Sequence, residues 1–296
     1  MPKLVWFNGS VSPLESAQVP AADHAHLYGD GLFEGIRFYN SRIFKLDEHL
    51  RRLYDGMRFL GFQEPMSYDA MRQAVIDTCA QADLGDGYIR LNVTRGTGLG
   101  LDPRAVKTLP NVMIMINTLA LYTPEQHEAG LDVVTTSWRV IQADSLDPRL
   151  KCIGRYAANI MAKREANMQN AGEGLMLNQQ GYVAECTGDN IFIVRDGVLR
   201  TPHPSCGILQ GITRDTVIEL AKRAGIEVRE EFLTIYDITS ADEAFLTGTA
   251  AEVIPMRSLD GRILGSGSAG PMTKQLVAAF REEIKLGTPY LVGTTA

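Results

Sequence analysis

Apolar and polar positions repeat along the chain with helical spacing in some segments and gather into short apolar runs in others. Residues 47–62 carry apolar side chains every three or four positions, which predicts an amphipathic helix. Residues 66–82 show a second helical segment, with Ser67 as a candidate N-cap. The runs at 88–94 and 111–122 predict strands. The first part of the chain is therefore expected to form a strand, two helices and then a sheet.

A polar stretch follows the second run and divides the chain. We expect an interdomain linker at 119–130, between a small N-terminal domain at 1–118 and a large C-terminal domain at 131–296. Turn signals at Gln180-Gly181 and Asp196-Gly197 separate strands in the second domain. The elements expected there are a strand at 131–140, a helix at 155–172, several strands across 173–202, a helix at 211–225, a strand within 241–256 and a helix at 270–287. This mixture predicts an α/β fold class of the α+β type.

Composition narrows the class of protein. The chain has 296 residues, 45% hydrophobic and 22% charged, which is enough for two domains with a sizeable core. A net charge of −6 argues against nucleic acid or an anionic membrane surface as the main partner. The four cysteines form no CxxC pair, and no metal site is expected. Neither a signal-peptide pattern nor a long apolar run is apparent, so we expect a cytoplasmic protein without a membrane partner.

One segment has the pattern of an anion site. Gly211, Ile212 and Thr213 open a predicted helix, where unpaired backbone N–H groups and the helix dipole stabilise a phosphate. The alternative is an ordinary helix start capped by Thr213 or Asp215. Arg52, on the helix at 47–62, could add donors to the same phosphate, or could be a solvated surface charge.

Lys151 and Glu185 are charged residues in apolar surroundings. Burial disfavours the ammonium form of a lysine and makes it a nucleophile toward an aldehyde such as pyridoxal 5′-phosphate. That cofactor also needs a phosphate site and a carboxylate facing its ring nitrogen. Glu185 lies in an apolar, strand-like run, where a carboxylate is costly without a partner. Lys151 as a surface lysine remains the alternative.

Other patterns carry less. The glycines of GTGLGL at 96–101 precede Asp102-Pro103 rather than a helix, so a dinucleotide fingerprint is not expected. His24 and His26 are expected to be structural or to line a pocket. Cys152, next to Lys151, could be an activated thiol but is more simply a small packing residue.

Several separated motifs occur in one order along the chain. They are DHAHLYGDGLFEGIRFYN (23–40), EHLRRLYD (48–55), YIRLNVTRG (88–96), LK with Tyr156 and EA (150–166), GYVAECTGDNIF (181–192), GILQGITRD (207–215) and FLTGTAAEVIPM (245–256). On these motifs, the chain resembles the class IV, fold-type IV, pyridoxal phosphate-dependent aminotransferases, and most closely the branched-chain aminotransferases. The resemblance runs from residue 8 nearly to the C-terminus. It implies an N-terminal α/β sandwich and a C-terminal pseudo-barrel.

The resemblance also implies residue roles. Lys151 is similar to the lysine that binds the cofactor and moves the proton. The cofactor site implied is Arg52, Tyr156, Glu185, Asn190, Leu209, Gly211, Ile212, Thr213, Gly248 and Thr249. The substrate site implied is Tyr28, Phe33, Gly35, Tyr88, Arg90, Tyr122, Thr249 and Ala250. In this reading Arg90 receives the γ-carboxylate of glutamate, while Tyr88 and the turn at 249–250 receive the α-carboxylate.

The implied reaction is amino transfer between a branched-chain or other hydrophobic L-amino acid and 2-oxoglutarate, in a homodimer or higher homo-oligomer. Two departures bear on specificity. The loop at 94–104 is one residue shorter than the branched-chain form, and Arg155 follows Gly154 where many relatives have Asn. The alternatives are a D-amino-acid or (R)-amine transaminase, an aminodeoxychorismate lyase of the same fold, and a non-catalytic protein that retains the fold.

Overall fold

The computed structural model describes residues 4–118 and 121–290, and these form two compact units. Unit 1 comprises the described residues within Met1–Leu119, Lys151–Arg155 and Glu283–Ala296. Unit 2 comprises those within Ala120–Leu150 and Tyr156–Glu282. The division differs from the expected domains because two short later segments belong to unit 1.

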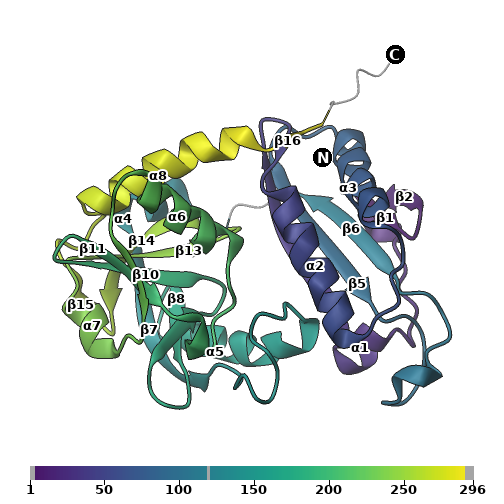
Figure 1. Ribbon diagram of the computed structural model, residues 1–296, viewed down its shortest axis with the longest axis horizontal. Coiled ribbons are helices and arrows are strands. Elements are labelled where there is room, and N and C mark those ends of the chain that lie inside the picture. Colours follow the sequence, from purple (N-terminus) through teal and green to yellow (C-terminus); the bar gives the residue numbers. More distant parts are fainter. Residues whose placement is uncertain (1–3, 119–120, 291–296) are drawn as a thin grey trace. The chain divides into compact units, whose positions relative to one another are not determined.

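Unit 1 is built on an antiparallel sheet. Among its described residues the sheet has seven strands in the order β16-β4-β3-β5-β6-β1-β2. Helices α2 and α3 pack against β3, β6 and β1 (Figure 1). The strands are β1 (Leu4–Phe7), β2 (Ser10–Pro13), β3 (Gly31–Tyr39), β4 (Arg42–Ile43), β5 (Gly87–Thr94), β6 (Val112–Asn117) and β16 (Thr288–Pro289). The helical segments are η1 (Leu14–Ser16), α1 (His24–Tyr28), α2 (Leu46–Leu60), α3 (Tyr68–Ala82), η2 (Pro103–Ala105), η3 (Ile153–Arg155) and η5 (Ile284–Leu286).

The two long helices of unit 1 confirm the sequence prediction. Helix α2 buries Leu50, Leu53 and Met57, which lie on one face at helical spacing. Helix α3 begins after Ser67, whose side chain accepts a hydrogen bond from the Ala70 backbone N–H at 3.3 Å. Alternate residues of β5 and β6 are fully buried, so one face of the sheet is apolar and packs beneath these helices.

Unit 2 is built on a larger mixed sheet. Its described residues give nine strands, with the order β12-β11-β10-β13-β14-β7-β8-β9 and β15 paired to β14. Pairs β11–β12, β14–β7 and β7–β8 are parallel. Strand β9, at one end of this order, also packs against β10 and β11, so the sheet curls towards closure. The strands are β7 (Leu131–Arg139), β8 (Glu173–Leu177), β9 (Val183–Cys186), β10 (Asn190–Arg195), β11 (Val198–Pro202), β12 (Val228–Glu231), β13 (Glu243–Gly248), β14 (Glu252–Leu259) and β15 (Arg262–Ile263).

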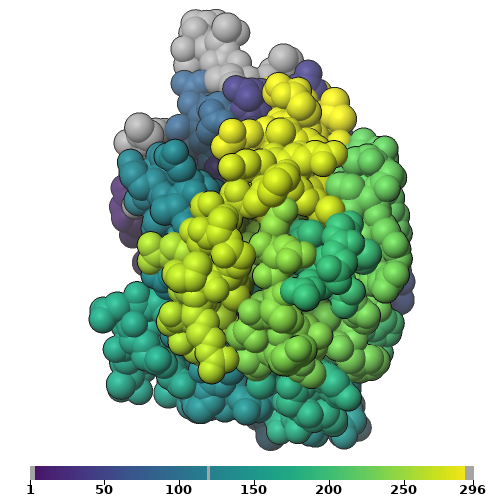
Figure 2. Space-filling view, turned by 90° about the vertical axis from the view of Figure 1, so that its left-hand side faces the viewer, coloured from purple at the N-terminus to yellow at the C-terminus, as the bar shows by residue number. Residues whose placement is uncertain are grey.

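Helices surround this second sheet. They are α4 (Pro124–Ala129), α5 (Tyr156–Met168), η4 (Pro204–Cys206), α6 (Ile212–Arg223), α7 (Ile235–Thr239) and α8 (Pro271–Glu283). The Glu243 carboxylate accepts from the backbone N–H groups of Met272 and Thr273 at the start of α8. This contact places a negative charge at the positive end of the helix. Figure 2 shows the yellow α8 segment at the molecular surface.

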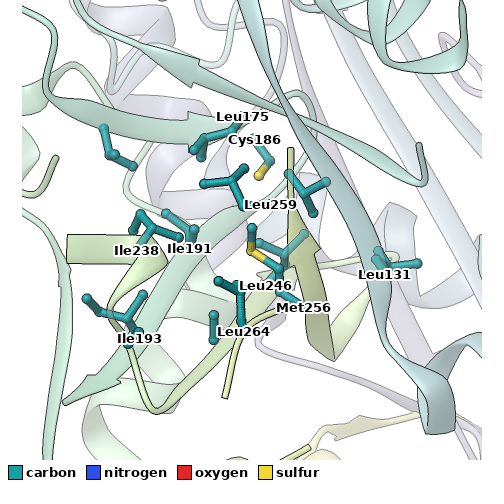
Figure 3. Packing of buried hydrophobic residues seen from close by; sticks show 14 of the residues in the cluster. Leu131, Leu175, Cys186, Ile191, Ile193, Ile238, Leu246, Met256, Leu259 and Leu264 are labelled. Carbon is teal, nitrogen blue, oxygen red and sulfur yellow. The ribbon is translucent and has the colours of Figure 1, made fainter. Parts of the chain in front are cut away.

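The core of unit 2 is formed by apolar side chains from most of its strands. Leu175, Ile191, Leu246 and Leu259 meet there and are at most 1% exposed (Figure 3). Complete burial of such a side chain stabilises the fold by about 1.5–3 kcal/mol. The positions of the catalytic candidates on β9, β10 and β13 are therefore fixed by a dry, packed interior.

Several predicted boundaries were wrong by a few residues. The helix expected at 155–172 ends at Met168, and the strand expected at 111–122 ends at Asn117. Leu119 and Ala120 of the expected linker lie outside the described residues, and α4 occupies 124–129 of its remainder. Strand β3 was not predicted because nearly all its positions are buried, so it shows no alternation. None of the described helices is long and apolar enough to cross a membrane.

Candidate functional site

Lys151 lies in unit 1 beside the start of β3. The Phe33 backbone N–H donates to the Lys151 carbonyl at 3.1 Å, and Cys152 forms a bridge with Leu32. The Lys151 side chain turns over the Phe33 ring, with Nζ 4.7 Å from the ring centroid. The segment after it is also fastened, because the Gly154 N–H donates to the Gly29 carbonyl at 3.1 Å. Lys151 is thus half-buried and its backbone is held on both sides.

Four of the predicted substrate residues share one face of the unit 1 sheet. In the β3–β5 register Gly35 is opposite Arg90, and Phe33 and Tyr88 lie on neighbouring positions of the same face. The Arg90 guanidinium carbon lies 3.5 Å from the Phe33 ring centroid. A Cβ on Gly35 would come within 2.3 Å of the Tyr88 hydroxyl. Glycine at 35 therefore makes room for that hydroxyl on the face that carries Phe33.

Arg52 projects to the opposite, helix-covered side and is not a solvated charge. Its Nε and Nη2 each donate to the Glu34 carboxylate at 2.7 Å, and His49 Nδ1 donates to the same carboxylate at 2.7 Å. Glu34 is fully buried. Burial alone raises the pKa of Glu34, but the charge and hydrogen bonds of Arg52 and the bond from His49 lower it to about 2.

His49 completes this buried triad in its neutral form. Burial is the main cause that lowers its pKa, and the positive charges of Arg52 and Lys151 act in the same direction against Glu34. The carboxylate therefore fixes Nδ1 as the protonated nitrogen. Arg52 is held as a forked, pre-oriented donor.

Tyr28 and His24 fasten the short loop that follows β5. The Gly100 N–H donates to the Tyr28 hydroxyl at 2.9 Å, and the Gly100 carbonyl lies 3.0 Å from His24 Nε2. His24 Nδ1 is 2.8 Å from Asp30 Oδ2, and Arg95 also pairs with Asp30. His24 is thus a structural residue, as expected, while His26 is exposed. In the part of the chain that the structure describes, no group of three His, Cys, Asp or Glu residues could hold a metal ion.

In unit 2, Glu185 is buried and held from one side. Its Oε2 accepts from the Leu209 N–H at 2.8 Å and from Asn190 Nδ2 at 3.3 Å. Asn190 Nδ2 also donates to the Leu209 carbonyl at 2.9 Å. A Cβ on Gly211 would lie 2.2 Å from Asn190 Oδ1, so this position requires glycine. The structure therefore brings Glu185, Asn190, Leu209 and Gly211 together.

Helix α6 begins directly beyond this group. Gly211 is its N-cap, and no side chain caps it, so the alternative of a cap by Thr213 or Asp215 was wrong. Ile212 and Thr213 occupy the first turn, and Thr213 is 4% exposed. The positive end of a twelve-residue helix is therefore presented without a protein carboxylate or hydroxyl as its cap.

The remaining predicted residues of unit 2 lie on neighbouring elements. Gly248 ends β13, and Thr249 and Ala250 form the turn that follows. Tyr156 opens α5 and is half-buried. Tyr122 packs against the core of unit 2, and burial raises its pKa well above the usual range, so it is a neutral phenol.

Sequence reasoning missed Glu34, His49, Glu173 and Asp189. All four are less than 7% exposed in the folded chain. The available signal was the same one that selected Glu185, namely a charged residue inside an apolar run. Arg155, which the sequence left unexplained, is 4% exposed in η3.

The comparisons with known proteins agree with one another. Residues 31–259 match the family model described as amino-transferase class IV. A putative branched-chain-amino-acid aminotransferase of Methanocaldococcus jannaschii is 43% identical over 279 residues, covering 94% of this chain and 95% of that protein. The crystal structure of the Escherichia coli branched-chain amino acid aminotransferase matches with a TM-score of 0.92 and 36% identity, covering 100% of this chain and 98% of that chain. A second crystal structure, of a branched-chain amino acid aminotransferase with pyridoxamine 5′-phosphate, matches with a TM-score of 0.90 and 34% identity, covering 96% of this chain and 94% of that chain; its source is given as T.th..

Proposed function

Because this chain belongs to the class IV aminotransferase family, we propose that it moves an amino group between a branched-chain or other hydrophobic L-amino acid and 2-oxoglutarate. It is a pyridoxal phosphate-dependent aminotransferase. The observation that carries the substrate class is the 43% identity, over 94% of this chain, to a putative branched-chain relative. The products are the 2-oxo acid of the donor and glutamate.

The residues present fit this cofactor. The uncapped start of α6 at Gly211 suits a phosphate, and Ile212 and Thr213 supply first-turn N–H groups and a hydroxyl. Arg52, pre-oriented by Glu34, is a second candidate for that phosphate. Glu185, already held by Leu209 and Asn190, suits a protonated ring nitrogen. When bound, pyridoxal phosphate withdraws electrons from the substrate Cα.

We assign the proton transfer to Lys151. Its Nζ is proposed to take the proton from the substrate Cα and to return it to C4′ of the cofactor, acting as general base and then general acid. The Phe33 ring beneath Nζ limits the directions the amine can take, since a cation is attracted to the ring face. Tyr156 is proposed to donate to the phenolic oxygen of the cofactor, and Gly248 and Thr249 to contact its phosphate.

The sheet face of unit 1 is proposed to select the substrate. Phe33 supplies an apolar wall for a branched side chain, while Arg90 offers a fork of donors to the γ-carboxylate of 2-oxoglutarate. Tyr88, the turn at 249–250, Tyr28 and Tyr122 complete the proposed substrate site. One methylene changes selectivity by only about 1–3 kcal/mol, so breadth among leucine, isoleucine, valine and methionine is expected.

Two finer assignments follow from the resemblance. We propose that the protein acts as a homodimer or higher homo-oligomer in the cytoplasm, without nucleic acid or membrane as a partner. The net charge of −6 supports the absence of a polyanionic partner. Sedimentation of the purified protein tests the assembly, and a monomer with full activity would contradict it.

A panel of L- and D-amino acids with 2-oxoglutarate tests the reaction. Glutamate should form from L-leucine and L-isoleucine, and the D-enantiomers should react far more slowly. No glutamate from either L-amino acid would refute the proposal. Glutamate from D-amino acids would support the D-transaminase alternative, and pyruvate release from aminodeoxychorismate would support the lyase.

A second experiment tests the assignment of Lys151. Borohydride reduction of the holoenzyme should fix the cofactor to this lysine, as located by peptide mass spectrometry. Lys151→Ala should form no reduced adduct. Lys222→Ala, which removes an exposed lysine of α6, is the matched control and should behave as the parent. An adduct on another residue of the parent would overturn the assignment while leaving the reaction class open.

A further inference from the structure

Unit 2 contains a cluster of buried carboxyl groups of which the proposed mechanism uses only one. Glu173, Glu185 and Asp189 are 3%, 5% and 6% exposed. Glu185 has its proposed partner in the cofactor ring. Carboxylates this deeply buried are costly, so Glu173 and Asp189 each need a compensating interaction.

Glu173 has the surroundings of an anion. Its Oε1 accepts from the Gly174 N–H at 2.8 Å and from the Thr187 hydroxyl, and its Oε2 accepts from the Gly188 N–H at 3.3 Å. The Lys163 ammonium lies 3.7 Å from Oε1. Three donors and a nearby positive charge all favour the ionised form, so Glu173 holds the negative charge of the cluster.

Asp189 has the opposite surroundings. Its Oδ2 is buried, and no donor for it exists among residues 4–118 and 121–290. Burial first, and then the negative charge of Glu173, raise the pKa of Asp189 well above its usual range, and Glu185 adds to the effect against Lys163. Two adjacent buried carboxyl groups with one lysine between them retain one proton. A protonated Asp189 also becomes a donor to Glu173.

Asp189 is also the support on which β13 ends. A Cβ on Gly248 would lie 1.9 Å from Asp189 Oδ1 and 3.4 Å from the Gly188 carbonyl oxygen. The backbone of Gly248 therefore rests directly on the 188–189 turn. Any movement of the Asp189 side chain is passed to the turn at 249–250.

We propose that Glu173 and Asp189 form a proton-sharing carboxyl pair, in which neutral Asp189 positions the Gly248–Ala250 turn for the cofactor and substrate. This inference rests on the proposed function, since that turn is assigned there to the phosphate and the α-carboxylate. Asp189 is thus a positioning residue, which acts through Gly248. Its proton is required because an ionised Asp189 would repel Glu173 and lift from beneath the turn.

The other titratable groups that face the pair do not alter this balance. Burial raises the pKa of the Cys186 thiol and of Tyr122, so both are neutral. Lys163 is the facing cation, and Glu185 is the remaining carboxylate. If Asp189 lost its proton, three carboxylates would face one lysine.

Infrared spectroscopy of the holoenzyme tests the location of the proton without relying on turnover. A protonated carboxyl has a C=O stretching band that a carboxylate lacks. The parent should show this band at neutral pH, and Asp189→Asn should lose it. Asp144→Asn, which changes an exposed carboxyl of the same unit, is the control and should keep it. Absence of the band in the parent, or its survival in Asp189→Asn, would overturn the proposal.

Isotope labelling gives the same answer without a substitution. When aspartate carboxyl carbons are labelled with ¹³C, the band of the parent should shift to lower frequency. A band that shifts only with labelled glutamate would place the proton on Glu173 and refute the assignment. The measurement stands even if a variant fails to fold.

Cofactor affinity tests the positioning role. Asp189→Ala should weaken pyridoxal phosphate binding about tenfold, or about 1.4 kcal/mol. Asp189→Asn, a neutral side chain of the same shape, should restore it to within about threefold. The affinity of the parent should fall at alkaline pH as Asp189 ionises, and that of Asp189→Asn should not. Equal affinities for the parent and Asp189→Ala would refute this inference alone, whereas failure of the amino-donor panel with these affinities intact would refute only the proposed reaction.

Discussion

Replacement of Glu34 by glutamine should destabilise unit 1 in a strongly pH-dependent way. In the parent, the Glu34 carboxylate accepts two hydrogen bonds from Arg52 and one from His49 while fully buried. Glutamine has the same shape, but its neutral amide cannot compensate the Arg52 charge. Removal of one partner of a buried ion pair leaves the other charge uncompensated.

The size of the effect follows from linkage. The pKa of Glu34 falls from 4.5 to about 2 on folding. Each unit corresponds to about 1.4 kcal/mol, so ionised Glu34 contributes on the order of 3 kcal/mol at neutral pH. A lowered carboxyl pKa gives stability that is present above the unfolded value near 4.5 and is lost as the pH falls towards 2. The difference between parent and Glu34→Gln should therefore shrink by about 2 kcal/mol between pH 7 and pH 3.

Urea unfolding followed by tryptophan fluorescence measures this difference. The chain has two tryptophans, Trp6 in unit 1 and Trp138 in unit 2. A Trp138→Phe background therefore leaves Trp6 as the reporter of unit 1. The matched control is Asp55→Asn, which removes an exposed ion pair with Arg58 on the same helix as Arg52 and should cost at most about 1 kcal/mol.

Two results would refute the reasoning about Glu34. One is a difference in unfolding free energy below about 1 kcal/mol at neutral pH, which would mean that the triad contributes little. The other is a large difference that stays constant on acidification, which would show that glutamine perturbs packing rather than charge.

Three further outcomes are expected. Gly211→Ala should weaken pyridoxal phosphate binding at least about tenfold in a fluorescence titration, because its Cβ would lie 2.2 Å from Asn190 Oδ1; unchanged affinity would contradict the tight packing. Gly35→Ala should raise KM for amino acids, because its Cβ would lie 2.3 Å from the Tyr88 hydroxyl, whereas Gly85→Ala, with open space around it, should leave KM unchanged. A thiol reagent should modify the native protein far more slowly than the urea-unfolded chain, and fast native labelling would contradict the burial of Cys79, Cys152, Cys186 and Cys206.

The sequence predicted the parts of the fold that depend on local pattern. The spacing of Leu50, Leu53 and Met57 identified α2, because a helix has a fixed period and this one buries a single face. The turn between β10 and β11 was readable from Asp196-Gly197, which have φ values of 51° and 76°. Such left-handed positions favour these residue types, so a two-residue signal was sufficient.

The candidate site was predicted mainly through motifs. Lys151 and Glu185 attracted attention as charges in apolar surroundings, but each also had an ordinary alternative. Only the co-occurrence of several motifs in order favoured the catalytic reading, and the family match over residues 31–259 agrees with it. The role assigned to each residue stays a prediction until the variants are measured.

Tertiary structure alone decided which partners the buried charges have. Glu34 meets His49 and Arg52 across 15 and 18 positions of sequence, and Glu173 meets the turn at 187–188 across 14 and 15. Residues 151–155 also join unit 1 although they follow the first strand of unit 2. Local pattern specifies elements because their periods are short, whereas ion pairs and proton sharing depend on which elements pack together. The free-energy cost of burying a charge makes those long-range pairings specific, but it does not name the partner in advance.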